Sequence, residues 1–315
     1  MNWHQIWEIA SAPDNVPIVA LLFLIPFFTW YAFRQALEND RLIERLEANP
    51  DLAKIHHRKN YPWRKEWDEK LHVWPYLLRI EFLAALIVTV ILMVWSITLN
   101  APLEEPSNPT LTMNPAKAPW YFLGLQEMLV YFDPWIAGVV MPTIILIGLM
   151  LIPYIDPNPL GNGYYTFRQR KFAILAFCFG FLILWITLIF IGTFIRGPGW
   201  MWFWPGMTWD PHRLIHEANR DLHEWILRVK VTPDNRWWIA LFGAAVVGGY
   251  FVAGLVGTHL LFTRTRMKAA FDRMNFFQIV TVQLLLVLML ALPLKILLRL
   301  VLRIKYVWVT PYFNI

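Results

Sequence analysis

The sequence predicts an all-α integral membrane protein with about six transmembrane helices and several short interfacial helices. Of its 315 residues, 57% are apolar and 16% charged, whereas average soluble domains have about 45–50% and about 25%. Six stretches are apolar enough to cross a hydrocarbon core of about 30 Å. The single cysteine, Cys178, lies inside one of them. This excludes a disulfide framework, a Cys-rich zinc site and a C-x-x-C-H haem attachment within the chain.

Each predicted span contains about 20 mainly apolar residues. The first lacks a basic region before it and a small-residue cleavage site after it, so we interpret it as an uncleaved span rather than a signal peptide. An even number of crossings puts both termini on the same side of the membrane. The spans are 16–33, 77–99, 135–154, 172–194, 237–262 and 276–301.

Basic residues in the connections predict the orientation, because Lys and Arg accumulate in cytoplasmic loops. The loops 35–78, 155–171 and 264–274 hold 15 of them, and the connections and termini on the other side hold 8. We therefore expect residues 35–78 in the cytoplasm and both termini outside. Because long apolar runs separate the basic residues, they form no continuous surface for nucleic acid.

The outer segment 197–236 is too long and too aromatic for a simple connection. Its tryptophans suit the headgroup layer, and Asp210-Pro211 is a plausible helix start. Apolar residues at helical spacing then predict a surface helix over 210–229. Within it, His216 and His223 are seven residues apart and are candidates to share a metal, although a solvated polar face explains them better. The apolar positions are Leu214, Ala218, Leu222, Trp225 and Val229.

The histidines argue against haem ligation by this chain alone, because a bis-histidine haem needs histidines in the middle of spans. Only His259 lies in a span, near its cytoplasmic end; the others lie outside the spans, at His4, His56, His57, His72, His212, His216 and His223. The span centres also carry almost no charge, which disfavours a transporter. The fifth span contains glycines that we expect to allow close helix contacts, namely Gly243, Gly248, Gly249, Gly254 and Gly257.

The most informative stretch is 114–135. Pro119 suits the first turn of a helix, where its missing N–H is not needed. From Trp120 onward, Gly124, Glu127 and Tyr131 share one helical face. Such a helix presents an aromatic ring, a gap, a carboxylate and a phenol to a cavity at the outer interface, which suits a flat, apolar, two-proton donor. An interfacial helix with its carboxylate in water explains the pattern equally well.

This stretch resembles a known family. The order of a span, a long outer loop, a Pro-Trp-Tyr-Phe helix, a span ending Leu-Ile-Pro-Tyr-Ile-Asp156 and a basic loop with Phe167-Arg168 resembles the C-terminal half of cytochrome b. In some quinol–cytochrome complexes this half is a separate subunit IV. The resemblance covers about 74–196. Ala118-Pro-Trp-Tyr-Phe is similar to the family's Pro-Glu-Trp-Tyr motif, and residues 114–127 are similar to a bacterial branch with split cytochrome b.

The resemblance implies half of a quinol-oxidation site near the outer surface, with quinol, expected to be menaquinol, as the substrate. The quinol-binding residues it implies are Pro119, Trp120, Tyr121, Phe122, Gly124 and Tyr131. Arg168 then lies at the inner side, as a quinone or lipid contact. Both b-type haems belong to a separate N-terminal cytochrome b subunit, and a Rieske protein or c-type cytochrome accepts electrons outside. The complex is expected to be dimeric and to lie in a bacterial inner membrane.

The sequence departs from the family pattern at the motif glutamate, which aligns with Pro119. Glu127 is our candidate for the catalytic carboxyl: half buried beside lipid, it is expected to cycle between neutral and charged forms near pH 7. Eight helical residues nevertheless displace it by about 12 Å and about 80°, so it does not simply replace the lost group. Glu104, Glu105, Tyr121 and Tyr131 remain rivals. No metal site is expected.

The chain therefore divides into four expected parts. Residues 1–73 form an N-terminal span and a basic cytoplasmic segment, 74–196 a cytochrome b-like three-helix core, 197–236 an outer amphipathic segment, and 237–315 two additional spans. We expect the added spans to dock partner subunits. The favoured function is an electron-transfer subunit that completes a quinol site, and the alternative is a structural membrane anchor without an active site.

Overall fold

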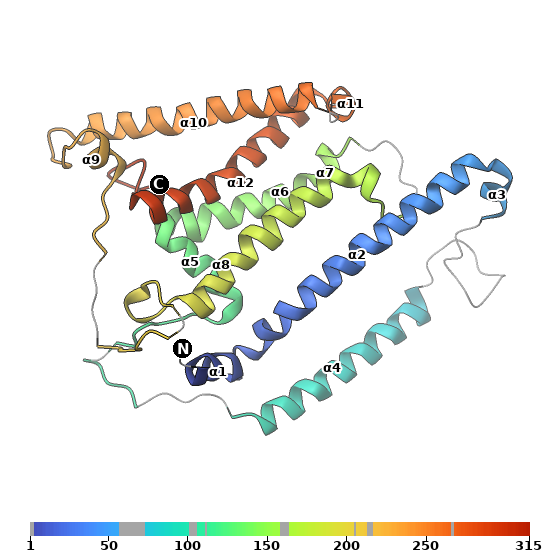
Figure 1. Ribbon diagram of the computed structural model, residues 1–315, viewed down its shortest axis with the longest axis horizontal. Helices are drawn as coiled ribbons and strands as arrows, with labels where there is room; N and C mark the ends of the chain where they lie inside the picture. Colours follow the sequence, from blue (N-terminus) through green and yellow to red (C-terminus); the bar gives the residue numbers. More distant parts are fainter. Residues whose placement is uncertain are drawn as a thin grey trace. The chain divides into compact units, whose positions relative to one another are not determined.

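The computed structural model describes residues 3–56, 73–100, 106–110, 112–157, 164–204, 206–212, 217–265 and 268–315. In these ranges the secondary structure is helical, with isolated β-bridges and no strands, so the expected all-α class is confirmed. The helices are α1 (Trp3–Ser11), α2 (Val16–Ala48), α3 (Pro50–Ile55), α4 (Leu78–Thr98), α5 (Leu123–Tyr131), α6 (Met141–Ile155), α7 (Phe167–Phe177), α8 (Ile186–Phe190), α9 (Leu222–Ile226), α10 (Arg236–Arg264), α11 (Lys268–Phe271) and α12 (Phe276–Leu302) (Figure 1).

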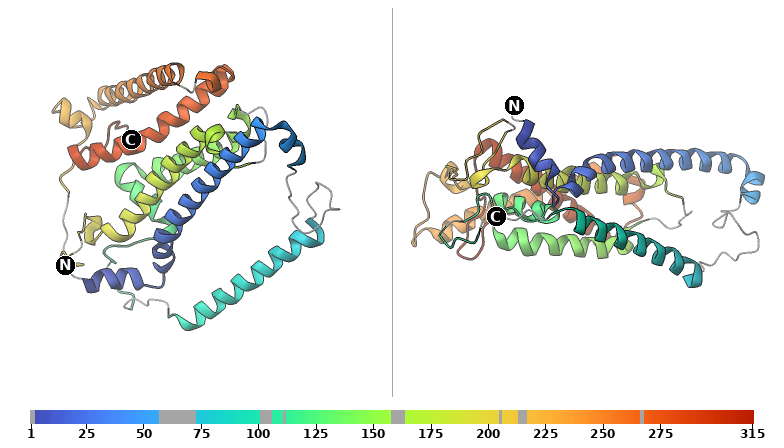
Figure 2. Two further views of the ribbon diagram at one scale, coloured as in Figure 1. Left: turned by 45° about the vertical axis from the view of Figure 1, so that its right-hand side comes forward. Right: turned by 90° about the horizontal axis from the view of Figure 1, so that it is seen from below.

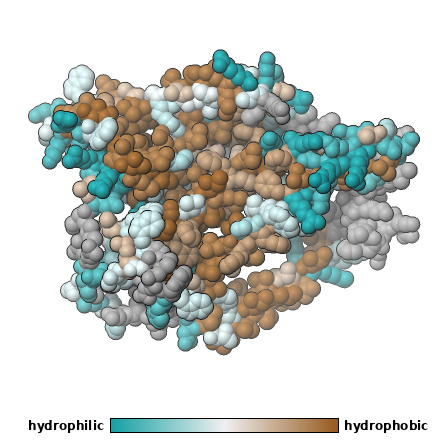
Figure 3. Space-filling view, viewed as in Figure 1, coloured by the Kyte–Doolittle hydropathy of each residue, from teal (hydrophilic) through white to brown (hydrophobic). Residues whose placement is uncertain are grey.

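Within the described ranges, six helical stretches are long and apolar enough to cross a membrane, which confirms the six predicted spans. They are Val16–Ala48, Val73–Thr98, Ile136–Ile155, Phe167–Ile195, Arg236–Arg264 and Phe276–Leu302. Helix α2, which contains the first predicted span, extends to Ala48, well beyond the predicted end at residue 33. Its polar continuation carries an Arg34–Glu38 pair one helical turn apart, a spacing that supports exposed helices. Figure 3 shows hydrophilic side chains gathered over this second half of α2, in contrast to the hydrophobic helical faces.

The chain forms two compact units. The second unit comprises His4–Asn108 and Gly163–Lys171. In it, the buried Asp40 accepts hydrogen bonds from the backbone N–H groups of Phe167 (3.2 Å) and Arg168 (3.1 Å). N–H groups in the first turn of a helix have no partner within the helix, and the Asp40 carboxylate supplies one. Its negative charge also interacts favourably with the dipole of α7.

The first unit comprises Met1–Trp3, Pro109–Asn162 and Phe172–Ile315. In it, α5 packs against α8 and the helical turn Ile191–Ile195, while α12 packs against α5, α6 and α10; α10 and α12 lie side by side in Figures 1 and 2. The added span α12 thus completes the core around α5. That core consists of Met128, Tyr131, Phe132, Ala137, Leu184, Leu188 and Leu292.

The expected surface helix over 210–229 is wrong for the described part of that range. Only α9 is helical there, because the preceding backbone bonds to the C-terminal tail instead. Arg220 N–H donates to the carbonyl of Arg303 (3.2 Å), and Leu222 N–H to that of Tyr306 (2.8 Å). His223 is correspondingly buried, at 1% exposure, rather than on a solvated face. Leu214 and His216 lie outside the described residues.

The glycines of α10 confirm a close helix contact at Gly254, and Gly243 makes a close contact with the C-terminal tail. A Cβ added at Gly243 would lie 2.6 Å from a ring carbon of Trp308, and one at Gly254 would lie 2.8 Å from Val287. At Gly248, Gly249 and Gly257 nothing lies within 4 Å of an added Cβ. Gly243 and Gly254 therefore admit the C-terminal tail and α12, and the remaining three glycines face open space within the described part of the chain.

Candidate functional site

The predicted helix of the 114–135 stretch is present and begins after Pro119. A tight turn at Trp120–Phe122 leads into α5, whose buried face contains Leu123, Gly124, Glu127, Met128 and Tyr131. An added Cβ at Gly124 would lie 3.2 Å from both Trp185 and Ile189. Gly124, Glu127 and Tyr131 therefore do share a face, as expected. That face packs against protein, and Gly124 provides a close helix contact.

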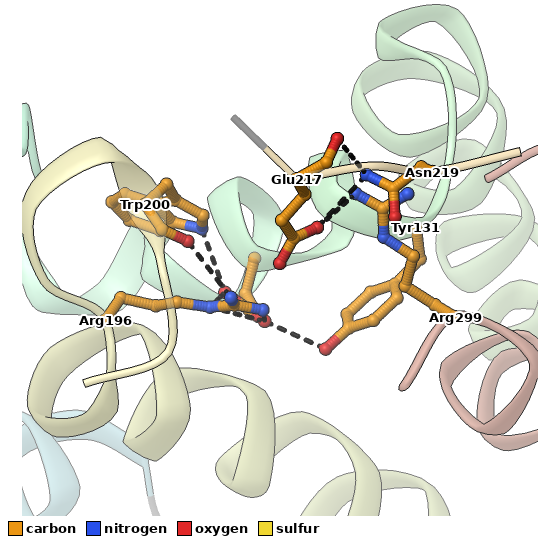
Figure 4. Close-up of polar contacts among 7 residues, drawn as sticks. Tyr131, Arg196, Trp200, Glu217, Asn219 and Arg299 are labelled. Carbon is orange, nitrogen blue, oxygen red and sulfur yellow. Dashed lines mark hydrogen bonds and ion pairs between the residues drawn. The ribbon is translucent and has the colours of Figure 1, made fainter. Parts of the chain in front are cut away.

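Glu127 is fully buried and forms a two-pronged ion pair with Arg196. The Arg196 Nε lies 2.9 Å from Glu127 Oε2, and an Nη lies 2.6 Å from Oε1, with side-chain exposures of 2% and 0%. The Tyr131 hydroxyl donates to Oε1 at 2.9 Å, and the Trp200 indole N–H donates to Oε2 at 3.1 Å. Figure 4 shows Arg196, Trp200 and Tyr131 converging on this point.

The loop that follows the fourth predicted span holds Arg196 in place. The second terminal nitrogen of Arg196 donates to the Trp200 carbonyl at 3.0 Å, and the Arg196 guanidinium lies 5.4 Å from the centroid of the Trp202 ring. The Phe203 N–H bonds back to the Ile195 carbonyl at 2.7 Å. Arginine suits this role because its planar fork matches a carboxylate and stacks on aromatic rings.

The Glu127 carboxylate is paired with a cation and accepts hydrogen bonds at both of its oxygens. A carboxylate that accepts hydrogen bonds from a guanidinium, a phenol and an indole has its charge and its lone pairs satisfied. Burial and the neighbouring Glu127 charge raise the pKa of Tyr131 well above its usual value, so Tyr131 remains a donor. The expectation of a half-buried carboxyl beside lipid is wrong, because α5 turns Glu127 toward Arg196. Its role as a catalytic proton carrier stays a prediction, and it would require Arg196 to release the carboxylate.

Replacing Trp200 with phenylalanine tests the indole contact. The variant keeps an aromatic side chain but replaces the indole with a phenyl ring that lacks the N–H donor to Glu127, and we expect a loss of about 1–3 kcal/mol in unfolding free energy. Denaturant titration of the purified protein in detergent measures it. Trp204→Phe is the control, because Trp204 is 58% exposed. Equal effects of the two substitutions would contradict the role of the indole N–H.

The other predicted quinol-binding residues lie at the surface. Pro119 is exposed, Trp120 is partly buried, and Tyr121 and Phe122 are each 51% exposed. Adjacent rings contact one another, with centroids 5.7 Å apart for Trp120 and Tyr121 and 4.6 Å apart for Tyr121 and Phe122. The predicted site thus divides into a buried polar part and an exposed aromatic part, which we call the aromatic surface (residues 119–122).

Lys117 belongs to the same region and was not among the predicted site residues. The Gln126 side chain binds the backbone on both sides of it, donating to the Ala116 carbonyl (2.7 Å) and accepting from the Ala118 N–H (2.8 Å). The Lys117 Nζ donates to the Thr193 carbonyl at 2.8 Å. The available sequence signal is that Lys117 is the sole basic residue of 100–134.

Three further predicted residues are placed as follows. Arg168 forms an ion pair with Glu44 within the second unit, where its side chain is 68% exposed; its contact with an inner-side quinone or lipid stays a prediction. The rivals Glu104 and Glu105 lie outside the described residues. Among the residues that are described, no group of three His, Cys, Asp or Glu side chains is arranged to hold a metal ion.

Residues 106–201 match the family described as cytochrome b(C-terminal)/b6/petD. The match covers less than a third of the chain and confirms the resemblance to the C-terminal half of cytochrome b for this segment. It indicates a cytochrome b6/petD-like subunit of a bc-type complex, which implies association with an N-terminal cytochrome b subunit. No curated protein and no solved structure matches the chain. The matched segment includes the aromatic surface, Lys117 and the Glu127–Arg196 pair.

Proposed function

We propose, from the cytochrome b C-terminal match of residues 106–201, that this chain completes the outer quinol-oxidation site of an electron-transfer complex. The observation that carries the proposal is the aromatic surface, whose Tyr121 and Phe122 rings are half exposed although they adjoin the buried face of α5. Flat apolar rings suit a quinol head group, because aromatic pairs add packing energy to the burial of their surface. A partner subunit supplies the other wall.

The division of the predicted site gives its two parts different roles. The Glu127–Arg196 pair fixes α5 against the loop that follows the fourth span, so the aromatic surface is held in one orientation. The aromatic surface contacts the quinol, with Pro119 setting the start of the turn. Under this proposal Glu127 is primarily a positioning residue, and its function as a catalytic carboxyl is an outcome to be tested.

The wider assembly follows from the same proposal. An N-terminal cytochrome b subunit holds the two b-type haems, and a Rieske protein or c-type cytochrome outside accepts the second electron. The quinone is menaquinone, the complex is dimeric and resides in a bacterial inner membrane, and residues 35–78 face the cytoplasm. The basic residue asymmetry of the loops supports this orientation. In the described part of the chain, α4 has no buried residue, so its surface is available to pack against the other subunits of this assembly.

The test is quinol-dependent haem reduction by the complex purified in mild detergent from its native membrane. With decylubiquinol and a soluble menaquinol analogue as donors, Tyr121→Ala and Phe122→Ala are each expected to raise KM about tenfold, because each ring loses about 1.5 kcal/mol of contact. Trp238→Ala is the matched control, since Trp238 is an aromatic residue that is 74% exposed on α10.

The outcomes separate the two functional readings. Co-purifying b-type absorbance, reduction by quinol, and a KM effect confined to Tyr121 and Phe122 support the quinol site. A complex that contains haem and oxidises quinol equally well in both variants identifies the chain as a structural anchor. The saturated Glu127 cluster is the observation that favours this alternative. A chain that purifies alone and colourless contradicts both.

A further inference from the structure

We propose that Lys117 accepts a proton from the quinol bound on the aromatic surface, an inference that rests on the function proposed above. Lys117 precedes Pro119 by two residues, so their Cα atoms are at most about 7 Å apart. A lysine stem is long and flexible. Under this proposal the amine exchanges its bond to the Thr193 carbonyl for one to a hydroxyl of a quinol whose ring lies against residues 119–122.

The position of Lys117 is built by its neighbours. Gln126 fixes the main chain at residues 116 and 118 through two hydrogen bonds. The amine then extends between the Thr193 carbonyl, 2.8 Å away, and the ring of Trp209, whose centroid lies 5.9 Å from Nζ. Gln126 belongs to α5, Thr193 to the end of the fourth span and Trp209 to the outer segment. Three separate parts of the first unit therefore define where the amine lies.

Among the described residues that face Lys117, the other charged group is already paired, which leaves the amine to exchange a proton. From α5, Glu127 faces it, but Arg196, Tyr131 and Trp200 already occupy that carboxylate. From the span end, the facing group is the Thr193 carbonyl, which does not titrate. From the outer segment, the Trp209 ring faces it, and the adjacent Asp210 is exposed.

The environment also places the titration of the amine in a useful range. Burial lowers the pKa of Lys117 from its ordinary value of 10.5 to about 8, against the opposing attraction of Glu127. Below that pH the amine is protonated and blocked; above it, the neutral amine is a base. Efficient acid–base groups have pKa values near the working pH. The contribution of Lys117 to the rate is therefore expected to rise as pH increases through about 8.

The reaction balances as follows. Quinol loses two electrons and two protons to become quinone. One O–H bond breaks as an N–H bond forms on Lys117, and the second proton passes to water on the outer side. One electron goes to a b-type haem of the partner subunit and the other to a high-potential Rieske or c-type acceptor. The Lys117 ammonium then returns its proton to the outer water, which restores the neutral amine.

Two substitutions and one control test this role in the intact complex. Lys117→Met removes the amine and retains the length of the side chain. Lys117→Arg retains the cation but does not release a proton, because a guanidinium stays charged in proteins. Lys230→Met is the control, since Lys230 is an exposed lysine of the outer segment. Haem content per complex establishes that each variant assembles.

We expect kcat at pH 8.5 to fall about 100-fold in both Lys117 variants, within the range typical of a lost acid–base group. The difference between the wild-type and Lys117→Met rates should grow with pH around a midpoint near 8, while Lys230→Met follows the wild type. As a readout independent of turnover, modification of Lys117 by an amine-selective reagent, followed by mass spectrometry, should increase with the same midpoint. A bound quinol analogue should protect Lys117 and leave Lys230 reactive.

Three results would overturn the proposal. An unchanged pH profile in Lys117→Met shows that the amine takes no proton, and full activity in Lys117→Arg shows that only its charge matters. Absence of protection by the analogue places Lys117 away from the quinol. If the wild-type complex oxidises quinol normally in any of these cases, Lys117 alone is eliminated. If it does not oxidise quinol at all, the proposed function fails as well.

Discussion

Replacing Arg196 with methionine is expected to destabilise the protein by about 3–5 kcal/mol, the largest effect of any single substitution considered for this chain. The variant leaves the Glu127 carboxylate fully buried without its cation, and two neutral donors remain to solvate it. The cost is high because an isolated charge in a low-dielectric interior has no water to stabilise it. Denaturant titration in detergent measures the loss.

Two comparisons identify the cause. Arg34→Met breaks an exposed pair with Glu38, in which both side chains are more than half exposed, so solvent screens the charges and the loss of the pair should change stability little. Adding Glu127→Gln to Arg196→Met removes the unpaired charge and should recover part of the stability, since an amide oxygen still accepts from Tyr131 and Trp200. If Arg196→Met costs no more than Arg34→Met, the buried pair is not what holds α5.

Replacing Gly243 with alanine is expected to cost about 1–3 kcal/mol in unfolding free energy. The new methyl group would lie 2.6 Å from the Trp308 ring and 2.8 Å from its Cα. Trp308 has little room to retreat, because its N–H and carbonyl both bond to Ile315, at 3.0 and 2.9 Å. The substitution therefore forces the C-terminal tail away from α10, which the same titration detects.

Gly248→Ala is the matched control for Gly243→Ala. It lies in the same helix, and nothing stands within 4 Å of its added Cβ. Alanine there should be neutral or should stabilise the helix by up to about 1 kcal/mol, because glycine is the poorer helix former. Similar losses at both positions would show that the effect comes from the helix itself and not from contact with Trp308.

The sequence predicted the membrane spans well because their signal is local. Twenty consecutive apolar residues are sufficient to identify a span, whatever it packs against. The surface helix over 210–229 failed for the opposite reason. Its apolar spacing was helical, but the backbone at Arg220 and Leu222 bonds to residues about 85 positions later in the chain. Periodicity within a segment carries no information about such a partner.

The candidate site shows the same limit at the level of single residues. Glu127 and Tyr131 are one helical turn apart, so their shared face was predictable, and the hydrogen bond between them is present. Arg196 is 69 residues from Glu127, and no local pattern connects them. Lys117 was missed because its surroundings come from Gln126, Thr193 and Trp209 together. Only the folded chain brings these three to one place.

The bonds of Gln126 to the Ala116 carbonyl and the Ala118 N–H have a consequence for sequence divergence. Both partners are main-chain atoms, so substitutions of the side chains at positions 116 and 118 leave these two hydrogen bonds in place. Position 126 has no such freedom, although it lies nine residues from Lys117 and does not touch the amine. Among homologues, substitutions at position 117 should therefore track substitutions at position 126 more closely than those at its immediate neighbours.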